Sequence, residues 1–218
     1  MIQVILLDGS AVDAPWPDPA QVLAPEEVNR YRTLRSDSRR REFLLGRMLL
    51  KAALTEKDHG RARDFTTIAT TVSATGKPSV AGAQFSLSHD GEAVLLAVGD
   101  QPVGVDMETV QEFDGAMMDT CFSGEERRRI RRALHPDRVA TLTWCIKEAV
   151  AKAGGAGIES VIGSTARNGL FVRGGFAPVA GRERAYAVCS PLPLSPIEIV
   201  PAIPRFSKVF AGHPHSES

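Results

Sequence analysis

The chain has 218 residues, 43% of them hydrophobic and 24% charged, a length that fits one large domain or two small ones. Lys and Arg number 26, as do Asp and Glu, so the formal net charge is zero. Neutrality argues against a protein that binds nucleic acid through bulk charge and against a disordered acidic tail.

The number and spacing of the cysteines and the lack of long apolar runs indicate the cellular compartment of the protein. The three cysteines form no C-x-x-C pair, so a disulfide framework or a zinc site is not expected. No apolar run approaches the roughly 20 residues that a transmembrane helix needs. The short apolar start has no basic flank and predicts a strand, not a signal peptide. These features predict a soluble cytoplasmic protein.

The first half of the chain predicts a strand, two helices and then further strands. Pro25 marks a helix start, and the next helix shows apolar residues at helical spacing. The expected elements are a strand at 2–7, an irregular connection at 11–25, a helix from Pro25, a helix at about 37–54, and strands at 65–72, 84–88 and 93–98.

The second half repeats the order of strand, helices and strands. Its expected elements are a strand at 103–108, helices near 112–120, 124–134 and 137–153, and strands at about 169–173, 184–189 and 197–200. Runs of helices followed by strands favour an α+β fold. We expect two subdomains, 1–101 and 102–218, with a loose tail after about residue 201, and we suspect that they are a structural duplication.

One candidate site is the run Gly104-Val105-Asp106-Met107-Glu108. Side chains alternate along a strand, so Asp106 and Glu108 share a face, with Cα atoms roughly 6.6 Å apart. Two such carboxylates repel each other unless a cation lies between them, and their oxygens suit Mg²⁺. The alternative is an edge strand with a solvated acidic face.

A second candidate is the helix that contains Trp144, Glu148 and Lys152. These residues are spaced i, i+4 and i+8, so they lie on one side of the helix. A common Glu–Lys helix pair beside a core tryptophan would give the same pattern.

Further candidates could bind phosphate. Ser88 and His89 follow one another near the end of an expected strand, where a hydroxyl, a backbone N–H and an imidazole could meet an anion. Arg39 and Arg47 fall roughly on one face of the first long helix, and arginine binds phosphate through paired hydrogen bonds. The alternatives are a surface hairpin turn and a solvated helix face. The arginine-rich stretch at 127–132 is expected to lie at the surface.

The order of these pieces resembles that of the surfactin-type 4′-phosphopantetheinyl transferases. The resemblance covers roughly residues 30–155 and rests on five segments. They are Phe43-Leu44-Leu45-Gly46-Arg47, Gly76-Lys77-Pro78, Phe85-Ser86-Leu87-Ser88-His89, Gly104-Val105-Asp106-Met107-Glu108, and Trp144-Cys145-Ile146-Lys147-Glu148 with Lys152. These motifs are weak one by one and specific together.

The resemblance implies a pseudo-twofold pair of similar subdomains with coenzyme A bound in the cleft between them. It implies transfer of the 4′-phosphopantetheine arm of coenzyme A to a serine of an apo acyl or peptidyl carrier protein, with release of adenosine 3′,5′-bisphosphate. By position, the Mg²⁺ ligands would be Asp106, Glu108 and Glu148, and Lys152 would contact the attacked phosphate. Glu148 would be the base, and the remaining coenzyme A contacts would be Arg39, Arg47, Lys77, Ser88 and His89.

Two other classes of function compete with this interpretation. One is a catalytically inactive relative that binds coenzyme A or a carrier protein. The other is an RNA-binding module that uses residues 127–132, against which zero net charge and 6% aromatic content argue. We expect no nucleic-acid or membrane partner, and we expect a monomer, because one chain would hold a complete site.

Overall fold

The computed structural model describes residues 2–11, 16–57, 64–72, 78–155, 157–163, 169–194 and 200–201. Helices and mainly antiparallel sheets alternate along the chain, which confirms the α+β class. None of the helices in these ranges combines the length and the apolarity needed to cross a bilayer. Residues 76 and 77 of the predicted turn at 76–78 and most of the C-terminal tail lie outside the described residues, whereas Pro78 begins a short strand.

The first half is built on a four-stranded sheet with the order β4-β5-β1-β9. Its strands are β1 (Gln3–Asp8), β4 (Gln84–Asp90), β5 (Ala93–Gly99) and β9 (Val200–Pro201), and only the β1–β9 pair is parallel. The other elements are η1 (Gly9–Ala11), α1 (Pro19–Val22), α2 (Pro25–Thr33), α3 (Asp37–Lys57), η2 (Phe65–Thr67), β2 (Thr71–Val72) and β3 (Pro78–Ser79).

The second half is built on a three-stranded antiparallel sheet with the order β6-β8-β7. Its elements are β6 (Gly104–Thr109), α4 (Gly115–Cys121), α5 (Gly124–Arg132), α6 (Pro136–Gly154), η3 (Ile158–Ser160), β7 (Phe171–Val179) and β8 (Arg182–Ser190). Both halves therefore run strand, long helix and hairpin, and in both the last hairpin strand pairs with the first strand. A pseudo-twofold relation between them, and the boundary after residue 101, stay predictions.

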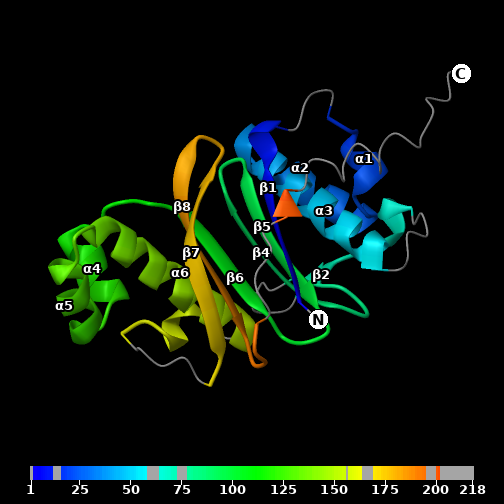
Figure 1. The fold of residues 1–218 in the computed structure, drawn as a ribbon. Coiled ribbons are helices and arrows are strands. Elements are labelled where there is room, and N and C mark those ends of the chain that lie inside the picture. Colours follow the sequence, from blue (N-terminus) through cyan, green and yellow to red (C-terminus); the bar gives the residue numbers. More distant parts are fainter. Residues whose placement is uncertain are drawn as a thin grey trace, which may run out of the picture.

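The two sheets pack face to face, and each has a long helix on its outer face (Figure 1). Every residue of β5 is buried, because its two faces meet different layers. Val94, Leu96 and Val98 belong to the core that includes α3, whereas Ala93, Leu95 and Ala97 share a core with β6 and β8. On the far side of the second sheet, α6 packs on Ala185, Ala187 and Cys189. The order of layers is helix, sheet, sheet, helix.

Two predicted segments of the first half were wrong in part. The connection at 11–25 contains α1, because Asp18 caps the backbone N–H of Ala20 and Pro19 occupies the first helical position. The strand predicted at 65–72 is confined to Thr71–Val72. Residues 65–67 form a 3₁₀ turn, in which Asp64 accepts hydrogen bonds from the backbone and hydroxyl of Thr66. Threonine side chains bonded to the local backbone compete with a strand.

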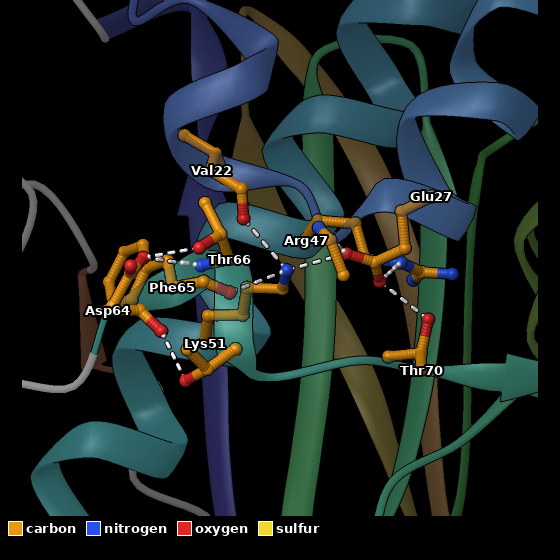
Figure 2. A network of polar contacts seen from close by, with 10 residues as sticks. Val22, Glu27, Arg47, Lys51, Asp64, Phe65, Thr66 and Thr70 are labelled. Carbon is orange, nitrogen blue, oxygen red and sulfur yellow. Dashed lines mark hydrogen bonds and ion pairs between the residues drawn. The ribbon is translucent and has the colours of Figure 1, made fainter.

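Each long helix carries a buried lysine that holds the preceding helix in place. Lys51 Nζ of α3 lies 2.5 Å from Glu27 Oε2 and donates to the carbonyl of Phe65, 14 residues further on (Figure 2). Lys147 Nζ of α6 lies 3.0 Å from Glu126 Oε2 and donates to the carbonyl of Val161, also 14 residues further on. Both glutamates are the N3 residue of their helix and accept a hydrogen bond from the N-cap backbone N–H, so the two halves repeat this arrangement.

Side chains of β4 cover the edge of β6 that does not pair with β8. The backbone N–H groups of residues 105, 107 and 109 donate to Ser86 Oγ, Ser88 Oγ and Asp90 Oδ2. The outward N–H groups of every second β6 residue are thus satisfied by every second β4 side chain. This seam joins the two halves and lies beside the acidic residues of β6.

Candidate active site

Asp106 lies at the centre of the site and is almost fully buried. Its Oδ1 atom accepts hydrogen bonds from Lys152 Nζ at 2.7 Å and from Ser88 Oγ at 2.9 Å. Its Oδ2 atom is also buried but has no hydrogen-bond partner among the described residues. Burying an acceptor without a partner costs free energy. The second oxygen of Asp106 is therefore suited to an additional donor or a cation.

Gly104 brings the two motifs of the site together. A Cβ atom at this position would lie 1.9 Å from the carbonyl oxygen of Ala149 and 2.5 Å from the nitrogen of Ala153. Only glycine lets the backbone of α6 lie this close to β6. The i, i+4 pair Glu148 and Lys152 of α6 then faces the acidic side of β6, where Lys152 reaches Asp106 across 46 positions of sequence.

The other two predicted metal ligands are carboxyl groups that resist ionisation. Burial raises the pKa of Glu108 to about 7, and the charges of Asp106, Asp90 and Glu148 add to this effect, while Lys152 opposes it. Burial and the charge of Asp106 also raise the pKa of Glu148. Repulsion among neighbouring carboxylates favours their neutral forms, and a cation between them would reverse that preference.

The chemistry of this donor set fits Mg²⁺. Hard oxygen ligands, including one or two carboxylates and substrate phosphates, are what Mg²⁺ takes in proteins. Asp106 Oδ2 offers a buried oxygen that lacks a partner in the described part of the chain, and Glu108 and Glu148 offer two more carboxyl groups. No three His, Cys, Asp or Glu side chains in the described ranges already enclose a metal position. The magnesium assignment stays a prediction.

Ser88 and His89 face different surroundings because they alternate on β4. The hydroxyl of Ser88 donates to Asp106 and accepts a hydrogen bond from the N–H of Met107, so it belongs to the seam. His89 is exposed, and its Nδ1 lies 3.6 Å from Glu42 Oε2 of α3. The structure therefore brings Ser88, but not the His89 ring, into contact with Asp106. Their predicted contacts with nucleotide phosphates stay predictions.

The basic residues predicted to bind coenzyme A are dispersed. Arg39 is exposed on the first turn of α3. Arg47 is buried, with Nε 2.9 Å from Glu27 Oε1 and the guanidinium 4.7 Å from the centre of the Phe43 ring. Lys77 lies outside the described residues. Figure 2 shows Arg47 beside Glu27 in the same buried network as Lys51 and Thr70. The structure brings neither arginine into the Asp106 cluster.

Sequence reasoning missed a contribution of Asp90 and Arg184 to this region. Asp90 Oδ2 accepts hydrogen bonds from the N–H of Thr109 at 2.7 Å, from its hydroxyl and from Arg184 Nε at 3.0 Å. Arg184 is buried on β8 and also donates to the carbonyls of Asp90 and Val179. The two residues are 94 positions apart, and no local pattern in the sequence indicates their contact.

Comparison with known proteins agrees with this geometry. Residues 102–168 match the family model of the 4′-phosphopantetheinyl transferase superfamily, a segment that includes both β6 and α6. The chain is 33% identical over 146 residues to the 4′-phosphopantetheinyl transferase psf-1 of Bacillus pumilus, which covers 64% of this chain and 60% of that protein. It is also 33% identical over 92 residues to the 4′-phosphopantetheinyl transferase gsp of Aneurinibacillus migulanus, which covers 41% of this chain and 39% of that protein.

These matches support the resemblance that the motifs predict. The chain is similar to 4′-phosphopantetheinyl transferases, and its predicted resemblance to their surfactin-type branch is confirmed. The aligned part of the chain spans less than two thirds of the length of either relative.

Proposed function

We propose that this protein transfers the 4′-phosphopantetheine arm of coenzyme A to a serine of an apo acyl or peptidyl carrier protein. The serine oxygen forms a bond to the phosphorus that bears the pantetheine. The bond from that phosphorus to the bridging oxygen of the pyrophosphate breaks, and adenosine 3′,5′-bisphosphate leaves.

The single observation behind the proposal is the cluster formed by β6 and α6. Asp106 is held by Lys152 and Ser88, and Glu108 and Glu148 complete an acidic group with raised pKa values. This cluster lies within the part of the chain that matches the family model. Acidic oxygens beside a lysine are what a reaction at a pyrophosphate needs, because catalysis of phosphoryl transfer consists largely of positioning and charge stabilisation.

Each residue has a proposed role. Asp106, Glu108 and Glu148 would hold Mg²⁺, which when bound would neutralise charge on the pyrophosphate. Glu148 would accept the proton of the carrier serine, because a positioned carboxylate can act as a general base. Lys152 would contact the attacked phosphate and donate a proton towards the leaving group. Arg39, Arg47, Lys77, Ser88 and His89 would contact coenzyme A, which we place in a cleft between two pseudo-twofold halves.

An inactive relative that binds coenzyme A or a carrier protein is the alternative. The retained Asp106, Glu108, Glu148 and Lys152 favour the enzyme, because a binding protein has no need of three carboxyl groups that repel one another.

The test uses coenzyme A with a fluorescent group attached to its thiol. We expect the wild-type protein with Mg²⁺ to attach the label to an apo carrier protein, seen as a fluorescent band after denaturing electrophoresis. The matched control is the same carrier protein with its acceptor serine replaced by alanine. Labelling of both carrier forms would show a side reaction. Binding of coenzyme A without labelling of any carrier would favour the inactive relative.

A further inference from the structure

The ammonium group of Lys152 lies beside the buried carboxylate of Asp106, which needs a positive charge nearby when no substrate is bound. Its Nζ atom is 2.7 Å from Asp106 Oδ1, and the side chain of Asp106 is only 3% exposed. A buried carboxylate without a partner is costly, and the ion pair with Lys152 offsets part of the cost of burying Asp106. The side chain of Lys152 is 32% exposed, so it is less enclosed than the carboxylate that it contacts.

Ser88 holds the Asp106 carboxylate by a contact that is independent of Lys152. Its hydroxyl donates to the same Asp106 Oδ1 and is fixed in turn by the N–H of Met107. Both residues of this contact are buried in the seam between β4 and β6. Departure of Lys152 would therefore leave the position of Asp106 unchanged while removing its counter-charge.

We propose that Lys152 is a counter-ion latch, which neutralises Asp106 in the free protein and is released to the pyrophosphate when coenzyme A binds. The proposal rests on the proposed function, in which Asp106 is a metal ligand and Lys152 a phosphate contact. A divalent cation that approaches Asp106 in the free protein meets the ammonium of Lys152, and like charges repel. The pyrophosphate attracts Lys152 away and adds negative charge, so it removes this repulsion.

The consequence is positive coupling between the cation and coenzyme A. Each should strengthen the binding of the other by the same factor, because binding linkage is reciprocal. Coupling between two binding sites typically changes the affinity for each ligand about 5- to 150-fold. Pantetheine, which has no phosphate, should produce no coupling.

The test measures Mn²⁺ binding by electron paramagnetic resonance, at about pH 8 where exposed carboxylates are ionised. For the wild-type protein we expect Mn²⁺ affinity to rise at least about fivefold with coenzyme A and to stay unchanged with pantetheine. In Lys152→Met the Mn²⁺ affinity without coenzyme A should rise, and the coupling factor should fall below that of the wild type, leaving only the part that the phosphates supply directly to the cation. Lys152→Arg keeps the charge and should keep the coupling. Arg173→Met removes an exposed charge on β7 and should behave as wild type.

The outcomes separate this proposal from the proposed function. Equal Mn²⁺ affinity of the wild-type protein with and without coenzyme A would overturn the latch, even if carrier labelling is normal. Coupling that persists unchanged in Lys152→Met would overturn it as well. If Lys152→Met fails to fold, as seen by thermal unfolding, Lys152→Gln, which also removes the charge, takes its place, and coupling equal to that of the wild type in this variant would overturn the latch. Failure to label any carrier would instead contradict the proposed function, whatever the metal binding shows.

Discussion

At the scale of single residues, the site depends on a few carboxyl groups in unlike surroundings. Asp106 has one oxygen bonded to Lys152 and Ser88 and one buried oxygen without a partner in the described ranges. Glu27 is equally buried, but Lys51, Thr70 and the N–H of Ala24 all donate to it. The fully bonded carboxylate of Glu27 suits a structural role, whereas the carboxylate of Asp106 suits the proposed metal site.

Replacement of Asp106 or Glu148 by alanine should abolish transfer without unfolding the protein. Each change removes one oxygen ligand of the proposed Mg²⁺ site, and loss of a single group that stabilises charge costs about 10²- to 10³-fold in turnover. Initial rates of carrier labelling and thermal unfolding curves should be recorded together. Turnover like that of the wild type in either variant would remove the metal assignment.

Glu27 gives a prediction for stability against pH. Burial alone raises the pKa of Glu27, but hydrogen bonds from Lys51, Thr70 and Ala24, with the charge of Lys51, outweigh burial and lower it below its usual 4.5. Such a carboxyl contributes stability above the unfolded pKa and loses it as the pH falls through the folded pKa. Glu27→Gln leaves buried cations without their counter-charge and should reduce the free energy of unfolding by about 3–5 kcal/mol near neutral pH.

The pH dependence of this loss of stability shows whether Glu27 acts through its charge. The difference in stability between wild type and Glu27→Gln should narrow as the pH falls below about 4.5, because the wild-type carboxyl then becomes protonated. Urea unfolding at several pH values measures this difference. A difference that stays constant into the acid range would mean that Glu27 acts through packing and not through its charge.

At the scale of elements, the contact between β6 and α6 sets the geometry of the site. Gly104 allows the backbone of the helix to touch the strand, and Glu148 and Lys152 are placed by that contact. The same contact explains why two weak motifs, separated by about 40 positions, form one cluster.

Gly104→Ala should therefore harm both stability and transfer. The new Cβ would overlap the backbone at Ala149 and Ala153, and overpacking of this kind costs at least about 1–3 kcal/mol. The matched control is Gly115→Ala, where a Cβ meets nothing within 4 Å and an alanine in a helix gains up to about 1 kcal/mol. Chemical unfolding and labelling rates measure the effects. A Gly104→Ala protein with the stability and rate of wild type would contradict the close contact.

The sequence predicted the two carboxylates of β6 on one face and the pair Glu148 and Lys152 on one side of α6. It could not predict that Ser88 bonds to Asp106, because side-chain alternation does not say which strand lies alongside. It also could not predict the partner of Arg47, since Glu27 lies on another helix, 20 positions earlier. The strand predicted at 65–72 was mostly wrong because hydrogen bonds from Thr66 and Thr67 to Asp64 favoured a turn.

At the scale of the whole molecule, two halves with the same order of elements meet along β4 and β6. The seam residues Ser86, Ser88 and Asp90 replace a backbone ladder with side-chain acceptors, and Arg184 of the second sheet reaches Asp90 of the first. The repeated lysines, Lys51 and Lys147, stabilise each half by the same means. The halves thus share a plan, while only β6 and α6 of the second half carry the acidic cluster.

The surface of α5 supports a prediction about partners. Arg128 and Arg131 are exposed on this helix, and a basic helix would steer an acidic carrier protein. Reversal of both charges to glutamate should raise the KM for the carrier with little change in the KM for coenzyme A. Steady-state rates at several salt concentrations measure this, because steering weakens as salt screens charge. An unchanged KM for the carrier would place docking elsewhere.

The proposed transfer of the phosphopantetheine arm to a carrier protein is tested most directly by intact-protein mass spectrometry of an apo carrier protein incubated with this protein, coenzyme A and Mg²⁺. We expect the carrier to gain the mass of one phosphopantetheine group, and we expect a chelator to prevent the gain. An unchanged carrier mass across fatty acid, polyketide and peptide carriers, alongside measurable binding of coenzyme A, would contradict the proposed transfer.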